Sequence, residues 1–364
     1  MAKKKDRIQS ALQVLPGIEP PSSVSEDAVS RLKKTRRGKL SVEEYLVGIR
    51  TGNRVILSKA ITLVESTKAE DQAIAQELVE KCLPFSGHSI RIGITGVPGA
   101  GKSTFIEALG TFLTHSGHQL AVLAIDPSSS RSKGSILGDK TRMEELSADS
   151  NAFIRPSPSS GTLGGVARKT WESIVLCEAA GFDVIFVETV GVGQSETAVY
   201  SMVDFFLLLM LAGAGDELQG IKRGIIEMAD IIVINKSDGE NVRKATSAAQ
   251  EYRNALALYP KQESGWNPPV VTCSSLEKTG VDQIWDIIED YKEFTSGNHH
   301  FENRRSEQSI LRMHQSIQEA LTHDLYGNPQ LAKMIEKLER RIKESQLSGY
   351  IAAHQIIEYY RTHR

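Results

Sequence analysis

The stretch Gly96-Val97-Pro98-Gly99-Ala100-Gly101-Lys102-Ser103-Thr104 decides the fold of this 364-residue chain. It matches the pattern GxxxxGKS/T, in which glycines let backbone N–H groups turn inward and surround a phosphate. An apolar run precedes it, and a helix-like segment that includes Phe105 follows, so a helix dipole also favours an anion there. We expect a nucleotide-binding loop in which Lys102 reaches the β- and γ-phosphates and Ser103 ligates magnesium.

Short runs rich in valine and isoleucine alternate with helix-length segments on both sides of this loop. Apolar runs without polar alternation are typical of strands buried on both faces. The runs are 90–95, 120–125, 182–187, 205–211, 230–234 and 269–272. Helices between them supply crossovers, so the sequence predicts an α/β fold of the P-loop NTPase type. Its mostly parallel central sheet is flanked by helices, with ligands at the carboxyl ends of the strands.

Helical extensions are expected on both sides of that domain. We predict an N-terminal helical extension over 1–88, the P-loop domain over 89–296 and a C-terminal helical arm over 297–364. The arm carries a narrow apolar stripe at helical spacing, formed by Ile310, His314, Ile317, Leu321 and Leu325. Such a stripe packs either on the chain's own sheet or on a second subunit, and its likeness to a coiled coil favours a homodimer.

The residues Asn235-Lys236-Ser237-Asp238 follow the run 230–234 and fit the guanine-reading pattern NKxD. Guanine presents N1–H and its 2-amino group side by side, and the carboxylate of Asp238 can accept both hydrogen bonds. Adenine lacks this pair of donors, so Asp238 disfavours ATP. We expect the stem of Lys236 to lie over the base and Asn235 to tie this loop to the phosphate loop.

Two further segments complete the expected nucleotide site. Ser274, Ser275 and Leu276 follow the run 269–272, at the place where a backbone N–H meets guanine O6. Glu188 directly follows the run 182–187, and Gly191 comes three residues later. An acid followed by a glycine is expected beside a γ-phosphate. Glu188 would hold magnesium or a magnesium-bound water, and the Gly191 N–H would contact the γ-phosphate.

An acidic residue also follows the run 120–125. Asp126 would face the same crevice and either ligate magnesium through water or orient the attacking water. Asp139, in the long Ser- and Gly-rich segment that follows, is a second candidate metal ligand. The composition of this segment is typical of a switch that orders around the γ-phosphate.

Composition narrows the classes of function. Lys and Arg number 43 and Asp and Glu 45, a balance that argues against a nucleic-acid-coating protein. The three cysteines, Cys82, Cys177 and Cys273, are far apart, which argues against a disulfide scaffold and a thiolate zinc site. The longest apolar run, 205–214, is too short for a membrane span of ~20 residues. We expect a cytoplasmic protein that binds neither nucleic acid nor a membrane.

The arrangement of the apolar runs separates two GTPase classes. A helix-like segment, 166–180, lies between the runs 120–125 and 182–187, so these strands should be parallel rather than form the hairpin of the Ras-like plan. The chain therefore resembles the dimerising NTPases that include signal-recognition and metallochaperone GTPases.

Three motifs carry a closer resemblance: the segments 135–143 (SILGDKTRM), 188–196 (ETVGVGQSE) and 214–222 (AGDELQGIK). They resemble the MeaB/ArgK/MMAA family, GTPase chaperones of adenosylcobalamin-dependent methylmalonyl-CoA mutase and related acyl-CoA mutases, over roughly residues 40–330. The resemblance implies a homodimer and the use of GTP to gate cofactor loading and to protect the mutase. It also implies that Lys222 reaches the nucleotide when the partner is bound.

Together, the motifs predict a GTPase that uses Mg²⁺ with GTP and GDP, with Lys102, Asp126 and Glu188 as catalytic residues. The resemblance to the family adds Lys222 as a fourth. Two alternatives stay open. One is an ATP-dependent kinase of an amino-acid transport system, against which Asp238 speaks. The other is a metal-inserting GTPase, for which the isolated cysteines offer no ligand cluster.

Overall fold

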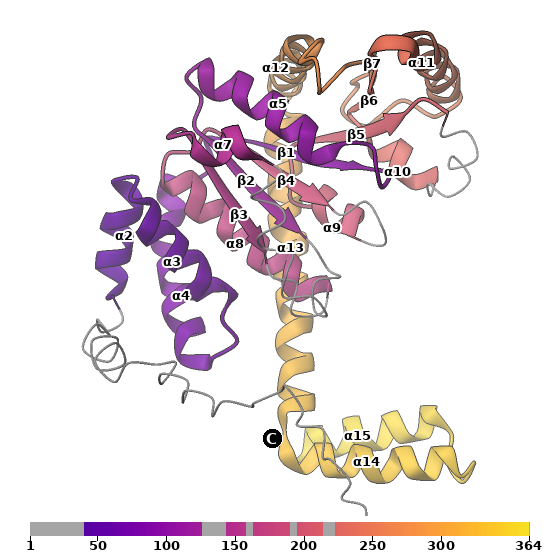
Figure 1. Ribbon diagram of the computed structural model, residues 1–364. Helices are drawn as coiled ribbons and strands as arrows, with labels where there is room; N and C mark the ends of the chain where they lie inside the picture. Colours follow the sequence, from indigo (N-terminus) through magenta and orange to yellow (C-terminus); the bar gives the residue numbers. More distant parts are fainter. Residues whose placement is uncertain (1–39, 126–142, 158–162, 190–194, 214–222, 364) are drawn as a thin grey trace, which may run out of the picture. The chain divides into compact units, whose positions relative to one another are not determined.

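A single sheet forms the centre of the protein. The computed structural model describes residues 40–125, 143–157, 163–189, 195–213 and 223–363. Within them, seven strands pair in the order β3-β2-β4-β1-β5-β6-β7, and every pairing is parallel (Figure 1). The strands are β1 (Ile90–Gly96), β2 (Leu120–Ile125), β3 (Ala152–Ser157), β4 (Val184–Thr189), β5 (Phe205–Leu211), β6 (Ile231–Asn235) and β7 (Val270–Thr272). The predicted α/β fold is confirmed.

Six strands coincide with the predicted apolar runs, whereas β3 was not predicted. This strand pairs only with β2, at the edge of the sheet. An edge position accepts Pro156, which has no N–H to donate, and Arg155, whose guanidinium bonds the side chains of Glu65 and Thr62. The arginine and the proline interrupt the apolar run that is typical of a buried strand. The sequence pattern alone therefore did not predict β3.

The parallel crossover between β2 and β4 is confirmed. These strands pair in register from Leu120 opposite Val184 to Ile125 opposite Thr189. Between them the chain passes through α7 (Glu144–Ala148), strand β3 and helix α8 (Leu163–Ala179). The sheet is therefore not built on the Ras-like hairpin.

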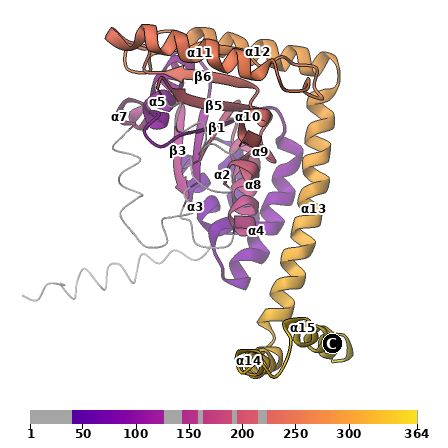
Figure 2. The same ribbon diagram turned by 90° about the vertical axis from the view of Figure 1, so that its right-hand side faces the viewer.

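Helices cover both faces of the sheet. Helices α5 (Lys102–His115) and α12 (Val281–Gly297) pack together over one face, while α8, α9 (Ser195–Tyr200) and α10 (Arg223–Met228) contact one another in turn over the other (Figures 1 and 2). Helix α11 (Val242–Leu256) packs on β6 and β7.

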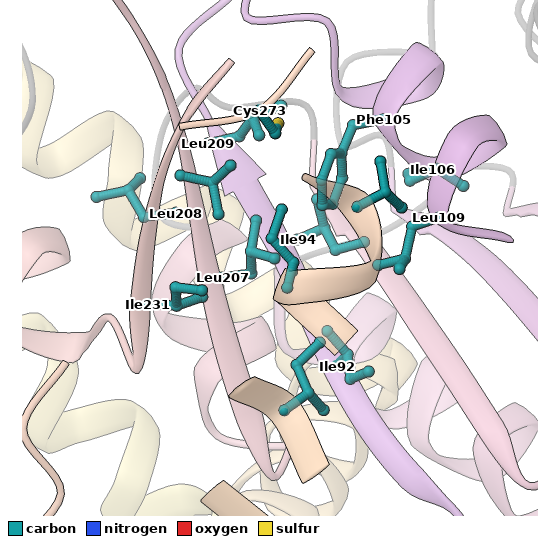
Figure 3. Close-up of a cluster of buried hydrophobic side chains, with 14 of the residues drawn as sticks. Ile92, Ile94, Phe105, Ile106, Leu109, Leu207, Leu208, Leu209, Ile231 and Cys273 are labelled. Atoms are coloured by element: carbon teal, nitrogen blue, oxygen red, sulfur yellow. The ribbon is translucent and has the colours of Figure 1, made fainter. Parts of the chain in front are cut away.

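The main core lies between the sheet and α5. Figure 3 shows Ile92 and Ile94 of β1 beside Leu207 and Leu209 of β5, facing side chains of α5 that include Phe105. These side chains are fully buried. Strand β1 directly precedes the phosphate loop and helix α5 directly follows it. Because both pack in this core, the core holds both ends of the loop in place.

Between residue 40 and the sheet, the structure has three helices. They are α2 (Val42–Arg50), α3 (Arg54–Glu65) and α4 (Ala69–Cys82), followed by a 3₁₀ turn, Leu83–Phe85. Helix α3 begins directly after Asn53, because Oδ1 of Asn53 accepts hydrogen bonds from the N–H groups of Val55 (3.1 Å) and Ile56 (3.2 Å). Helices α3 and α4 pack against α8.

Three helices also follow the sheet domain. They are α13 (His300–Gly327), α14 (Pro329–Lys343) and α15 (Gly349–Thr362), as predicted. Residues 42–364 form one compact unit, and the proposed boundaries at 88/89 and 296/297 stay predictions.

Two arginines attach α13 to the sheet. The Arg305 guanidinium donates to both carboxylate oxygens of buried Asp204, at 2.7 and 2.6 Å, and to the carbonyls of Gly87 and Ser89. The neighbouring Arg304 lies 3.7 Å from the carboxylate of Asp230. Since Asp204 and Asp230 directly precede β5 and β6, the first turns of α13 are fixed at the amino ends of these strands, opposite the phosphate loop.

Candidate functional site

The predicted site residues that the structure describes gather at one edge of the sheet. The phosphate loop follows β1, Glu188 lies near the end of β4, Asn235 ends β6 and Ser274 follows β7. All strands are parallel, so these residues meet at the carboxyl edge, where ligands bind in open α/β sheets. Four predicted site residues, Asp126, Asp139, Gly191 and Lys222, lie outside the described residues.

The phosphate loop depends on glycines at three positions. At Gly96 a Cβ atom would lie 2.1 Å from the carbonyl oxygen of Leu209 on β5, so only glycine lets the two strands approach. Gly99 and Gly101 have φ of +82° and +88°, in the left-handed region that favours glycine. Helix α5 then begins at Lys102, so its first N–H groups face the loop.

Backbone carbonyls of this loop hold the side chain of Lys102 in place. Its Nζ donates to the carbonyl oxygens of Gly96 (2.9 Å) and Val97 (3.4 Å). Burial lowers the pKa of the Lys102 ammonium, and the nearby carboxylates of Glu188 and Glu196 oppose that shift. An ammonium in such a place is well suited to an anionic ligand, which supplies the counter-charge that burial removes.

A hydroxyl and a carboxylate meet beside the lysine. The Oγ atom of Ser103 lies 3.5 Å from Oε1 of Glu188. Oxygen ligands of this kind suit Mg²⁺, which typically takes only one or two protein groups and completes its shell with phosphate and water. Within the described ranges there is no group of three or more His, Cys, Asp or Glu residues that could hold a metal alone. The pair therefore fits a magnesium that arrives with a phosphate ligand.

The side chain of Asn235 joins three loops. Its Nδ2 donates to the carbonyl oxygen of Ala100 at 2.8 Å, which ties β6 to the phosphate loop as predicted. Its Oδ1 accepts from the backbone N–H of Ser275 at 3.1 Å and from the Ser275 hydroxyl at 2.7 Å. Asn235 is only 1% exposed, so each of these hydrogen bonds is shielded from water.

Asp238 is oriented by the loop after β7. The Ser274 hydroxyl donates to Oδ2 of Asp238 at 2.5 Å, and the N–H of Glu277 donates to the same Ser274 oxygen. Asp238 itself is partly exposed, so part of its carboxylate stays open to a ligand. The stem of Lys236 runs beside the phosphate loop, since a Cβ atom at Gly101 would lie 3.9 Å from its Cε. Leu276 is largely exposed.

Sequence reasoning missed one buried acid near this edge. Glu196, the second residue of α9, is 2% exposed and its charge acts on Lys102. It belongs to the motif 188–196, but no spacing rule marked it as part of the site. Also missed was a pair of buried hydroxyls, in which Thr189 donates to Thr95 at 2.9 Å.

Known proteins resemble this chain over most of its length. The profile of the family described as "Methylmalonyl Co-A mutase-associated GTPase MeaB" matches residues 57–330. A protein of Mycobacterium tuberculosis named a probable GTPase is 51% identical over 318 residues, which cover 87% of this chain and 95% of that protein. The GTPase ArgK of Escherichia coli is 44% identical over 322 residues, covering 88% and 97%.

Two further relatives widen the comparison. The mouse mitochondrial protein named methylmalonic aciduria type A homolog is 45% identical over 331 residues, which cover 88% of this chain and 80% of that protein. Among solved structures, the crystal structure of a protein named LAO/AO transport system kinase superposes with a TM-score of 0.70 at 37% identity. The match covers 90% of this chain and 100% of that one.

Two glycine substitutions test whether Asn235 shapes the phosphate loop. Both Gly101→Ala and Gly99→Ala place a side chain in a left-handed conformation, a strain of about 1–2 kcal/mol. Only at Gly101 does the new Cβ meet a neighbour, Nδ2 of Asn235 at 2.9 Å; at Gly99 nothing lies within 4 Å. We expect Gly101→Ala to lower the free energy of unfolding, measured in denaturant, clearly more than Gly99→Ala. Equal losses would contradict the role given to Asn235.

Proposed function

Because the chain belongs to the MeaB family of methylmalonyl-CoA mutase-associated GTPases, we propose that it is a guanine-specific GTPase that assists an adenosylcobalamin-dependent acyl-CoA mutase. The chain is a P-loop GTPase by family and fold. In the proposed role it controls the loading of the mutase's cofactor and protects the loaded enzyme, using GTP hydrolysis to change state.

The observation that carries the guanine assignment is the hydrogen-bonded frame around Asn235 and Asp238. Asn235 links the phosphate loop to Ser275, and Ser274 fixes the carboxylate of Asp238. A carboxylate in this position can accept from N1–H and from the 2-amino group of guanine together. Adenine would leave it without those donors, and an unpaired acceptor costs about 1–3 kcal/mol.

The phosphates would lie along the loop Gly96–Thr104. Lys102 would exchange its hydrogen bonds to backbone carbonyls for bonds to the β- and γ-phosphates. Ser103 and Glu188 would hold Mg²⁺, which when bound neutralises charge on the phosphate oxygens. Asp126 and Asp139 as further metal ligands, Gly191 at the γ-phosphate and Lys222 as a partner-dependent contact stay part of the proposal.

The partner is proposed from family membership and from the names of relatives. The matching family is described as mutase-associated, and the mouse relative is named for methylmalonic aciduria. We propose the cytoplasm as the location, which rests on three cysteines that are unpaired and buried. No helix in the described part of the chain has the length and apolar character needed to cross a bilayer.

A homodimer is proposed from the apolar stripe on α13. Ile310, Ile317 and Leu321 repeat along this helix and are 56%, 49% and 50% exposed. Apolar side chains that recur along one helix, each half exposed, are typical of a face that pairs with another helix. The same stripe on a second copy is a self-complementary partner for it.

A second candidate function rests on the similar crystal structure, whose protein is named a transport system kinase. A kinase would transfer the γ-phosphate to a protein rather than to water and would use ATP. The frame around Asp238 favours GTP, so nucleotide preference separates the two functions.

Substituting Asp238 tests the guanine assignment. Asp238→Asn removes the acceptor for the two guanine donors, so we expect GTP affinity, measured by calorimetry, to fall roughly 10- to 100-fold. ATP binding should not worsen. Xanthosine triphosphate, which carries a carbonyl in place of the 2-amino group, should bind the variant better than the unchanged protein. Unaltered GTP affinity would contradict the assignment.

Capture from extract tests the mutase partner. The tagged full-length protein, loaded with a non-hydrolysable GTP analogue, should retain a cobalamin-dependent acyl-CoA mutase that mass spectrometry identifies. Lys102→Ala, which cannot hold the phosphates, is the control and should retain much less of it. If the loaded protein recovers no such mutase, the chaperone role is wrong while the GTPase assignment stands.

The oligomeric state tests the stripe on α13. Light scattering should give the mass of two chains, and Leu321→Asp should shift it toward one chain because it buries a charge in the paired face. Thr322→Asp, one residue off the stripe, should leave the mass unchanged. A single-chain mass for the unaltered protein would refute the dimer.

A further inference from the structure

The position of Glu196 follows from how α9 packs. This helix contacts β1 and β4, and it leads from the carboxyl end of β4 back to the start of β5. Its Val199 side chain lies against β1, since a Cβ atom at Gly93 would be 2.9 Å from Cγ1 of Val199. Glu196 is one turn earlier on the same face of the helix, so it lies toward the carboxyl edge of β1 and β4. Strand β1 leads into the phosphate loop, and Glu188 lies near the end of β4.

The carboxyl group of Glu196 is buried and incompletely bonded. Its residue is 2% exposed, and Oε2 has no hydrogen-bond partner in the described part of the protein. Native proteins satisfy most buried polar atoms, so an orphaned carboxylate oxygen calls for a ligand or a function. Among the described residues, Glu196 is also one of two acids whose charge acts on Lys102. The open acceptor therefore lies near the place where the lysine meets the phosphates.

The chemistry of the site indicates which group donates a hydrogen bond to Oε2 of Glu196. Lys102 directs its hydrogen bonds to two loop carbonyls and, in the nucleotide complex, to the phosphates. The pair Ser103 and Glu188 accounts for the metal. What hydrolysis still requires is an acceptor that orients the attacking water, because water has two O–H donors and must point a lone pair at phosphorus.

We propose that Glu196 accepts a hydrogen bond from the water that attacks the γ-phosphate and thereby positions it for GTP hydrolysis. The water oxygen forms a bond to the γ-phosphorus while the bond from that phosphorus to the β–γ bridging oxygen breaks, leaving its electron pair on GDP. The carboxylate of Glu196 takes the nearest proton from the water and then gives it to the released phosphate. Glu196 is therefore ionised again at the end of the cycle. The inference concerns the GTPase reaction and does not depend on the mutase.

A purely structural Glu196 predicts different behaviour. A carboxylate near the first turn of a helix can stabilise it through the helix dipole, and its removal would then destabilise the protein. A water-positioning carboxylate with an empty acceptor is instead a cost to the nucleotide-free protein. If the role of Glu196 is structural, removing its carboxylate lowers the stability of the protein. If Glu196 positions the water, removing the carboxylate raises the stability and lowers the rate of hydrolysis.

The test uses two variants of similar volume. For Glu196→Gln we expect the single-turnover rate of GTP hydrolysis to fall about 100-fold, with GTP and GDP affinities within about threefold of the unaltered protein. For Glu196→Met we expect the same loss of rate together with a thermal midpoint raised by about 2–4 °C without nucleotide. Glu227→Gln, an exposed acid on α10, is the matched control and should change neither quantity.

Three results would overturn the proposal. A Glu196→Met rate within twofold of the unaltered protein would show that this side chain does not position the water, because methionine offers no oxygen acceptor. A loss of nucleotide affinity with an unchanged rate would show that it acts on Lys102 instead. A lowered midpoint or failure to fold in both variants would show a structural role.

Discussion

The hydrogen bonds of one amide, the side chain of Asn235, hold the nucleotide site together. One end of this amide donates to the carbonyl of Ala100 in the phosphate loop, and the other accepts from the N–H and hydroxyl of Ser275. The amide also crowds any side chain at Gly101, where a Cβ atom would lie 2.9 Å from Nδ2 of Asn235. These hydrogen bonds hold the phosphate loop and the loop after β7 together. If they form the proposed nucleotide site, this arrangement would lower the ordering cost of binding.

The opposite edge of the sheet is fixed by charges. Arg305 and Arg304 of α13 meet Asp204 and Asp230, the residues that precede β5 and β6. Helix α9 connects the two edges: Glu196 at its start acts on Lys102, and the ring of Tyr200 at its end lies 4.5 Å from the guanidinium carbon of Arg304. Helix α9 therefore joins the surroundings of Lys102 to the first turn of α13 through the contacts of its two ends.

The sequence predicted the parts of this structure that depend on local pattern. Buried parallel strands and glycine-rich turns have strong local signatures, so six strands, the phosphate loop and the bond from Asn235 to it were all foreseeable. Strand β3 was not, because Arg155 and Pro156 interrupt its apolar run at an edge where both are tolerated. Glu196 was not either, since an unpaired oxygen is a property of three-dimensional packing that no spacing rule reports.

Ser274 shows how the frame creates specificity rather than mere affinity. Its hydroxyl occupies one acceptor position of Asp238, at 2.5 Å, yet an ionised carboxylate has about four such positions. In the proposed guanine site, the hydrogen bond from Ser274 would hold the carboxylate in one orientation, so guanine would meet an acceptor that needs no reorientation, while adenine would offer it no matching donors. A freely rotating carboxylate could turn toward water and accept adenine at little cost. In this proposal, the discrimination between the two bases depends on the position of the loop after β7 as much as on the charge of Asp238.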